Sequence, residues 1–295
     1  MRFSSDCLFC LLNRQQKQLQ QLPVSEEEKG IFLEHLLALL SERASVSSIP
    51  QLMPEISKLY WQDLHHSDTP AGMDEQKRRY NQLILDREEL LWQEITGAED
   101  PLLRALSLAQ VGNYIDFGTL NQVEDTEFLK LLHQAARTPL PSSVYASFRQ
   151  ELETAKTLVY CTDNCGEIGL DKLLIRLMAQ QYPHLSITAV VRGEPVLNDA
   201  TLEDARQVGL DQLVPVVGNG TAIPGTELDC ISPAVHTLLT QADLIISKGQ
   251  GNFETLHGCG LNIYYLFLCK CDYFVRKFQM ERFQGVFTKE SLLTP

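Results

Sequence analysis

The sequence predicts an α/β fold: a three-layer α/β/α, Rossmann-like arrangement with a mostly parallel sheet, preceded by an all-helical portion. From Thr157 onward, short apolar runs rich in β-branched and aromatic residues alternate with segments whose apolar residues recur at helical spacing. Such alternation is typical of a parallel sheet covered by helices on both faces. Before about residue 150 the apolar spacing is helical and strand signals are absent. We therefore predict a helical portion over residues 1–150 and an α/β domain over residues 151–295.

The helical portion is divided by prolines into several predicted helices. Ser25 and Glu28 have the spacing of a capping box, and the leucine-rich segment behind them predicts a helix. The segment from Asp74 to Trp92 predicts one long amphipathic helix whose charged residues form a solvated face. Pro139 and Pro141 mark the boundary to the second part.

In the second part, predicted strands and helices alternate. The predicted strands cover residues 157–162, 186–192, 213–217, 243–247 and 262–268, and the predicted helices cover residues 167–181, 201–208, 233–241 and 252–259. If the sheet is parallel, the carboxyl ends of these strands meet at one edge, which is where ligands bind in open α/β sheets.

The composition and charge narrow the class of protein. The chain has 295 residues, 44% of them hydrophobic, and a net charge of -13, so it has enough apolar residues to bury a core. The negative charge argues against binding to nucleic acid or to an anionic membrane surface. No apolar run approaches the ~20 residues of a membrane span, and no signal peptide is visible, so we expect a cytoplasmic protein. Nothing in the sequence sets the oligomeric state.

The cysteines leave several interpretations open. Eight cysteines in a chain of this size do not make a disulfide scaffold. Cys7 and Cys10 form a C-x-x-C motif, which binds metal, carries redox chemistry or simply places two thiols in a core. A structural zinc site needs about four ligands. The nearest candidates for the other two, Cys269 and Cys271, lie at the far end of the chain.

Three predicted strands end in polar residues: Asp163 and Asn164 follow the first strand, Asn198 and Asp199 the second, and Lys248 and Gly249 the fourth. Taken singly, each pair also suits an ordinary turn or helix cap. At one edge of a sheet, however, two carboxylates and an amide oxygen would form an all-oxygen set, which suits Mg²⁺ or Mn²⁺ and is poor for zinc.

The last of these strand ends has the features of an anion site. Lys248 adds positive charge, Gly249 allows close approach of the backbone, and the start of a helix offers free N–H groups to a phosphate. The alternative is a strand-to-helix turn capped by Asn252. Beside oxygen ligands for a metal, such donors indicate metal-assisted phosphoryl chemistry. A thiolate nucleophile from Cys161 or Cys165 would lack a histidine in the same segment to activate it.

One segment of the predicted helical portion also combines a glycine, an amide side chain and a carboxylate, as the polar strand ends do. Gly112 and Asn113 end a predicted helix, and Asp116 follows three residues later. On physical grounds a helix C-cap and a turn explain this segment at least as well as a binding role.

Together these motifs resemble those of the metal-dependent damage-control phosphatases, also called the acidic-residue-methyltransferase-like domain family. The resemblance rests on Asp163-Asn-x-Gly-Glu167, Asn198-Asp199-Ala-Thr, Lys248-Gly-Gln-Gly-Asn-x-Glu254 and Gly112-Asn-x-Ile-Asp-Phe-Gly118. It covers nearly the whole chain, and Cys7-x-x-Cys10 with Lys270-Cys271 resembles the stand-alone prokaryotic branch. Cys161 and Cys165 depart from the commoner aliphatic and small neighbours of the Asp-Asn pair.

The resemblance implies a divalent-metal phosphatase that hydrolyses small phosphomonoesters, such as sugar phosphates or damaged phosphometabolites, with Mn²⁺, Mg²⁺, Co²⁺ or Ni²⁺. It implies metal ligands at Asp163, Asn164 and Asp199, with Asp163 and Lys248 catalytic. Substrate or phosphate contacts are implied for Lys248, Gly249, Asn252, Asn113, Asp116 and Glu167. Either Asp163 attacks phosphorus to form an aspartyl-phosphate, or a water attacks directly. The alternatives are methyl transfer from S-adenosylmethionine to protein carboxylates and a non-catalytic metabolite-binding module.

Overall fold

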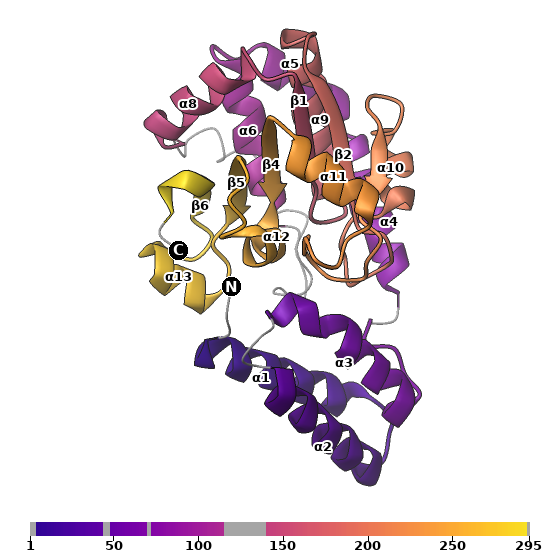
Figure 1. Ribbon diagram of the computed structural model, residues 1–295. Helices are drawn as coiled ribbons and strands as arrows, with labels where there is room; N and C mark the ends of the chain where they lie inside the picture. Colours follow the sequence, from indigo (N-terminus) through magenta and orange to yellow (C-terminus); the bar gives the residue numbers. More distant parts are fainter. Residues whose placement is uncertain (1–3, 44–47, 70–71, 115–139, 294–295) are drawn as a thin grey trace.

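The computed structural model describes residues 4–43, 48–69, 72–114 and 140–293 (Figure 1). The described elements before the sheet are all helices: α1 (Ser5–Gln21), α2 (Glu26–Arg43), α3 (Ile49–Leu64), α4 (Met73–Leu85), α5 (Glu88–Thr96), α6 (Pro101–Gly112) and α8 (Ser142–Leu152). Strands and helices then alternate: β1 (Thr157–Cys161), α9 (Glu167–Gln181), β2 (Ser186–Val191), α10 (Leu202–Val208), β3 (Val216–Gly218), α11 (Pro233–Gln241), β4 (Leu244–Lys248), α12 (Gly249–Leu256), β5 (Ile263–Leu268), α13 (Asp272–Phe278), β6 (Gly285–Lys289) and the short η1 (Glu290–Leu292).

The strands form one 6-stranded sheet in the order β3-β2-β1-β4-β5-β6. Neighbouring strands from β3 to β5 pair in parallel, and β6 runs antiparallel to β5. The mostly parallel sheet predicted from the sequence is therefore confirmed. The chain moves outward in one direction from β1 to β3 and in the other from β4 to β6. The direction of winding thus reverses between β1 and β4, which is where doubly wound sheets open a ligand-binding crevice.

Both faces of the sheet are covered, because successive residues of a strand point to opposite sides. On one face, Leu158 and Tyr160 of β1 belong to a core shared with α4, α5, α6, α8, α9 and α10. On the other face, Val159 and Cys161 pack with α11, α12 and α13. The three-layer α/β/α arrangement is confirmed, and the long apolar runs of β1, β4 and β5 follow from this burial on both sides.

Helices α1–α3 have a separate core, in which Phe32, Leu36, Ile56 and Tyr60 are buried. This unit lies below the α/β layers in Figure 1, with α3 against α12 and α1 against α13. Arg276 of α13 pairs with Asp6 of α1 at this junction. The hydrophobic cores thus divide the chain between α3 and α4, although the first strand begins only at Thr157.

Several local predictions are wrong. The segment from Asp74 to Trp92 is two helices, because Arg87 leaves helical geometry (φ -119°, ψ 3°) between α4 and α5. Helix α12 begins at Gly249 rather than at Asn252, and its N-cap is Lys248. Helix α13 and the antiparallel strand β6 were not predicted. The capping box at Ser25 is present, since its amide donates to Glu28 and its hydroxyl accepts from the Glu28 amide.

The structure places three of the terminal cysteines on adjacent helices, but no disulfide joins them. Cys7 and Cys10 lie on α1, and Cys271 is the N-cap of the adjacent α13. All eight cysteines are free thiols. Across the described ranges, no three His, Cys, Asp or Glu side chains are grouped as they would be around a metal ion. In the same ranges, no helix combines the length and apolarity needed to cross a membrane.

Candidate functional site

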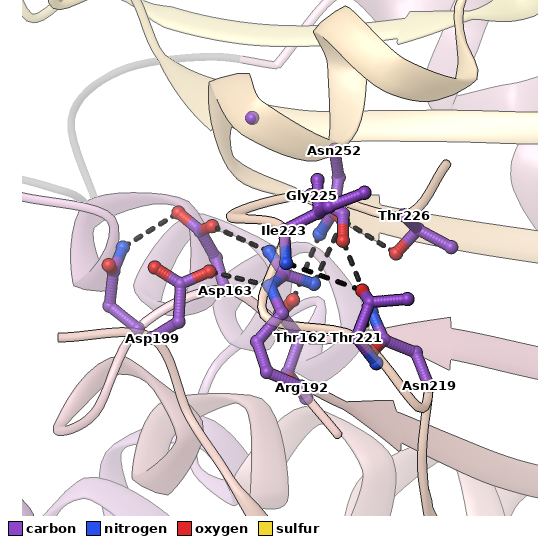
Figure 2. Close-up of polar contacts among 12 residues, drawn as sticks. Thr162, Asp163, Arg192, Asp199, Asn219, Thr221, Ile223, Gly225, Thr226 and Asn252 are labelled. Carbon is purple, nitrogen blue, oxygen red and sulfur yellow. Dashed lines mark hydrogen bonds and ion pairs between the residues drawn. The ribbon is translucent and has the colours of Figure 1, made fainter. Parts of the chain in front are cut away.

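The polar strand ends meet at the carboxyl edge of the sheet, where the winding reverses. Asp163 follows β1, Asp199 lies in the loop after β2, and Lys248 ends β4. Since β1 is paired with both β2 and β4, these residues are neighbours in the fold although they are up to a third of the chain apart in sequence. Figure 2 shows the part of this edge formed around Asp163 and Asp199.

Backbone hydrogen bonds hold the loop after β2 against the turn after β1. The amide of Ala200 donates to the carbonyl of Asp163 (2.7 Å), and the amide of Cys165 donates to the carbonyl of Asn198 (2.9 Å). Asn164 and Asp199 thereby form an isolated antiparallel bridge. The convergence of the two Asp/Asn pairs, predicted from a parallel sheet alone, is present and is reinforced by these bonds.

Asp163 is held by several neighbours. Its Oδ2 accepts hydrogen bonds from the side-chain amides of Asn113 (2.9 Å) and Asn164 (2.7 Å), and its Oδ1 lies 3.4 Å from Nη2 of Arg192. Burial, followed by the charges of Glu167 and Asp199, raises the pKa of Asp163 well above its usual range, against the opposing effect of Arg192 and Lys270. A further cation beside this carboxyl would favour its ionised form.

Asp199 is joined to Asp163 by one guanidinium. Nε of Arg192 donates to Oδ2 of Asp199 (2.5 Å), so the arginine contacts both carboxylates (Figure 2). We call Asp163 and Asp199 the acidic pair. Their side chains keep a small exposed area, 11% and 6%, whereas that of Arg192 has none.

Gly249 brings the start of α12 into contact with Asp163. A Cβ atom at this position would lie 2.0 Å from Oδ2 of Asp163, and the residue has φ +78°, in the left-handed region. Glycine is thus required here for two reasons, the close approach and the backbone conformation. The first turn of α12, with its unpaired amides, therefore begins beside Asp163.

The side chain of Lys248 lies in a fully buried cluster of charged residues. Its ammonium group donates to the carbonyl of Ala109 (2.8 Å), to Glu167 (2.6 Å) and to Asp171 (2.6 Å). We call Lys248, Glu167 and Asp171 the lysine triad; all three side chains have 0% exposure. Burial disfavours the charge of Lys248, but Asp171 and Glu167 outweigh it and raise the pKa of the lysine. Since all three N–H donors are used within the protein, a direct phosphate contact by Lys248 stays a prediction.

The predicted asparagines also have protein partners. Asn113 donates to Asp163 and Glu167, and its oxygen accepts from the amide of Leu268 (3.1 Å), so it links α6 to β5. Asn252 donates to the carbonyls of Thr162 (2.9 Å) and Lys248 (2.7 Å), which ties together the ends of β1 and β4. A phosphate contact by either residue likewise stays a prediction. Asp116 lies outside the described residues.

Three residues at this edge were missed by sequence reasoning. Arg192 directly follows an apolar strand. This position could have indicated a nearby carboxylate, because a buried arginine needs a carboxylate partner. Asp171 lies one helical turn after Glu167, so both face the same way from α9. Asn81 of α4 accepts a hydrogen bond from the amide of Gly166 (2.6 Å) and thereby fixes the turn after β1, but no local pattern indicates this.

Comparison with known proteins places this arrangement in a family. Residues 3–285 match the family model described as the damage-control phosphatase ARMT1-like domain. The chain belongs to this family. It is 31% identical over 276 residues to a "Damage-control phosphatase" of Archaeoglobus fulgidus, with 92% of this chain and 93% of the relative covered. It is 26% identical over 288 residues to "Damage-control phosphatase PH1575" of Pyrococcus horikoshii, covering 96% of each.

The fold agrees with this membership. The crystal structure of a DUF89 family protein (ph1575) from Pyrococcus horikoshii matches with a TM-score of 0.79 and 25% sequence identity, over 98% of this chain and 99% of that one. The resemblance inferred from the motifs is therefore confirmed. Membership in the damage-control phosphatase family supports a phosphatase activity in general terms.

For a damage-control phosphatase, the donor set at this edge fits a hard divalent cation. Asp163 and Asp199 offer carboxylate oxygens, and Oδ1 of Asn164, which accepts one bond from Asn198 (2.8 Å), has a second lone pair. The carboxylates also outnumber the cations: Asp163, Glu167, Asp171 and Asp199 stand against Arg192, Lys248 and Lys270. Excess buried negative charge is costly unless a further cation balances it.

The two cysteines beside the acidic pair do not serve as nucleophiles in this structure. Burial raises the pKa of Cys161 to about 12 and raises that of Cys165 well above its usual value. Both side chains are fully buried. They are therefore protonated thiols, and they act as small core residues on either side of the turn.

Proposed function

We propose that this family member is a divalent-metal-dependent phosphatase that hydrolyses small phosphomonoesters, either sugar phosphates or damaged phosphometabolites. The observation that carries the proposal is the contact between Asp163 of the acidic pair and the start of α12 at Gly249. It combines oxygen ligands for a cation with amides that suit a phosphate oxygen. Two curated relatives named damage-control phosphatases support phosphatase activity.

Asp163, Asn164 and Asp199 would hold the ion. A bound divalent cation would polarise a phosphate oxygen or acidify a water in this site. The other residues prepare the position: Asn113 and Asn164 fix the rotamer of Asp163 through its Oδ2, and Gly249 leaves room for the carboxylate. The phosphoryl group would lie at the first turn of α12. Lys248 would hold Glu167 in place behind this edge, where Glu167 accepts hydrogen bonds from Asn113 and Asn164.

The test is hydrolysis of p-nitrophenyl phosphate by metal-stripped protein, with Mn²⁺, Mg²⁺, Co²⁺ or Ni²⁺ added back singly. We expect turnover to require a metal and to fall at least about 100-fold in Asp163→Asn and Asp199→Asn, which also lose bound Mn²⁺ by calorimetry. The matched control is Asp243→Asn. Asp243 accepts bonds from Lys156 and Thr157 at the opposite, amino edge of the same sheet, so its loss leaves turnover unchanged.

Two results would contradict the proposal. One is equal turnover by wild type and Asp163→Asn in the presence of metal. The other is a folded, metal-loaded wild type without activity on p-nitrophenyl phosphate or on any sugar phosphate tested. In that case, binding of S-adenosylmethionine is the next measurement, since methyl transfer is the competing activity.

A further inference from the structure

Arg192 is a buried charge that the proposed chemistry does not use. It follows the last residue of β2, and its side chain has 0% exposure. It is among the largest fully buried side chains of the described residues. Burying a guanidinium costs several kcal/mol unless charged partners and hydrogen bonds compensate, so its position requires an explanation from its contacts.

Each of the three guanidinium nitrogens of Arg192 contacts an oxygen atom of the protein. Nε donates to Asp199 (2.5 Å), Nη2 lies 3.4 Å from Asp163, and Nη1 donates to Oδ1 of Asn252 (3.1 Å). Asn252 is itself held by the hydroxyl of Thr226, which donates to the same oxygen (2.8 Å). Figure 2 shows the arginine between the acidic pair on one side and Asn252 on the other. Arg192 is thus built into the protein and does not extend toward a ligand.

The acidic pair needs a cation even when no metal is bound. The backbone bonds between the turn after β1 and the loop after β2 force the two carboxylates together. Neighbouring carboxylates in a poorly solvated site repel each other, and one then tends to hold a proton. A single guanidinium that contacts both offsets part of this repulsion, because its fork of donors serves two acceptors at once.

We propose that Arg192 is a built-in counter-cation, a positioning residue that holds the acidic pair in place before any divalent ion arrives. Arg192 would also make the net charge of the site positive when a divalent ion is bound. Two carboxylates and a divalent cation are together neutral, and the guanidinium adds one positive charge, which favours a phosphate in a protein whose net charge is -13. This second consequence rests on the proposed function, and the first does not.

The test is a double-substitution cycle on metal-free protein, read by thermal unfolding. Arg192→Gln leaves both carboxylates without their shared cation, and we expect its Tm to fall by roughly 5–10 °C. Adding Asp199→Asn removes the repulsion, so the double variant should unfold at a higher temperature than Arg192→Gln alone. Arg192→Lys should retain part of the wild-type Tm. If Arg192→Gln does not fold, folding of the double variant supports the proposal equally.

The matched control is Arg104 of α6, a second buried arginine, which pairs with Glu94 of α5. Arg104→Gln should lower the Tm by an amount that Asp199→Asn does not restore. Additive effects of Arg192→Gln and Asp199→Asn would overturn the proposal, since they would mean that Arg192 only fills space.

Addition of Mn²⁺ tests the link to the metal separately. Mn²⁺ should raise the Tm of Arg192→Gln more than that of wild type, because the ion takes over the neutralisation of the pair. If Mn²⁺ raises neither Tm while Asp199→Asn still rescues Arg192→Gln, the metal in the proposed function is wrong and the counter-cation is right. If Mn²⁺ raises both by the same amount while Asp199→Asn still rescues Arg192→Gln, the ion binds away from the acidic pair, so the metal site of the proposed function is wrong and the counter-cation is right.

Discussion

The acidic pair together with Arg192, and the lysine triad, each consist of two carboxylates and one long cationic side chain, but they differ in how completely they are buried. In the triad, Lys248 reaches both carboxylates at 2.6 Å and no side chain is exposed. In the acidic pair, Arg192 reaches one carboxylate at 2.5 Å and the other only at 3.4 Å, and both carboxylates keep some exposed area. Residue types alone therefore do not separate an ion site from a structural ion cluster; the separation comes from burial.

The comparison assigns stability to the triad and function to the acidic pair. Removing a member of a closed, buried cluster leaves charges that nothing else can solvate. Removing a member of the partly exposed acidic pair should lower the stability less than a change in the triad does, and should lower the activity more. Three substitutions test this division.

Lys248→Met should have the largest effect, and the effect should be on stability. It leaves Glu167 and Asp171 buried without their cation, which costs about 3–5 kcal/mol. In a chain of this size the Tm should fall by roughly 10 °C. The control is Lys77→Met, because Lys77 pairs with the single carboxylate of Asp204. A Lys248→Met protein with wild-type Tm and no phosphatase activity would break the division and return Lys248 to a direct phosphate contact.

The position of Lys248 illustrates what sequence reasoning can and cannot predict. Its place at the end of β4 was predicted, and so was its neighbourhood with Asp163. The direction in which its side chain points was not predicted, although the alternation of side chains along a strand indicates it. Leu244 and Ile246 face the core shared with α6 and α9, so Lys248 faces the same way. The carboxylates that receive it come from α9, and their number on that face decides whether the lysine is available to a ligand.

Gly249→Ala should have the next largest effect, on activity. The new Cβ would lie 2.0 Å from Oδ2 of Asp163 and would displace the carboxylate. A displacement of about 1 Å in a catalytic group costs on the order of 100-fold in rate. Gly260→Ala is the matched control, because Gly260 has the same φ of +78° but no atom lies within 4 Å of the place where its Cβ would stand. Equal activity losses in the two variants would mean that backbone strain, and not contact with Asp163, is responsible.

Other parts of the site lie beyond local sequence patterns. The alternation of strands and helices was sufficient to predict the parallel sheet and the meeting of its polar strand ends. It could not indicate that Asn81, some 85 residues before Gly166, would fix the turn after β1. Nor could it indicate that Asn252 would clamp two strand ends and Arg192 instead of capping α12. These bonds depend on tertiary distances, which a single sequence does not contain.

The smallest expected effect is a pH dependence of stability that originates in the triad. Burial raises the pKa of Asp171 to about 6, against the opposing charge of Lys248, and its Oδ2 has no hydrogen-bond partner among the described residues. Because the folded pKa is higher than the unfolded value of about 4, the folded state binds the proton more tightly, and stability falls as pH rises between these values. Asp171→Asn keeps an oxygen for Tyr160 and Lys248 but cannot titrate. The measurement is urea unfolding of the two proteins from pH 4 to pH 7. The free energy of unfolding of wild type should fall relative to that of Asp171→Asn up to about pH 6, and above that pH the difference should stay constant. Parallel curves over the whole range would mean that folding does not raise the pKa of Asp171.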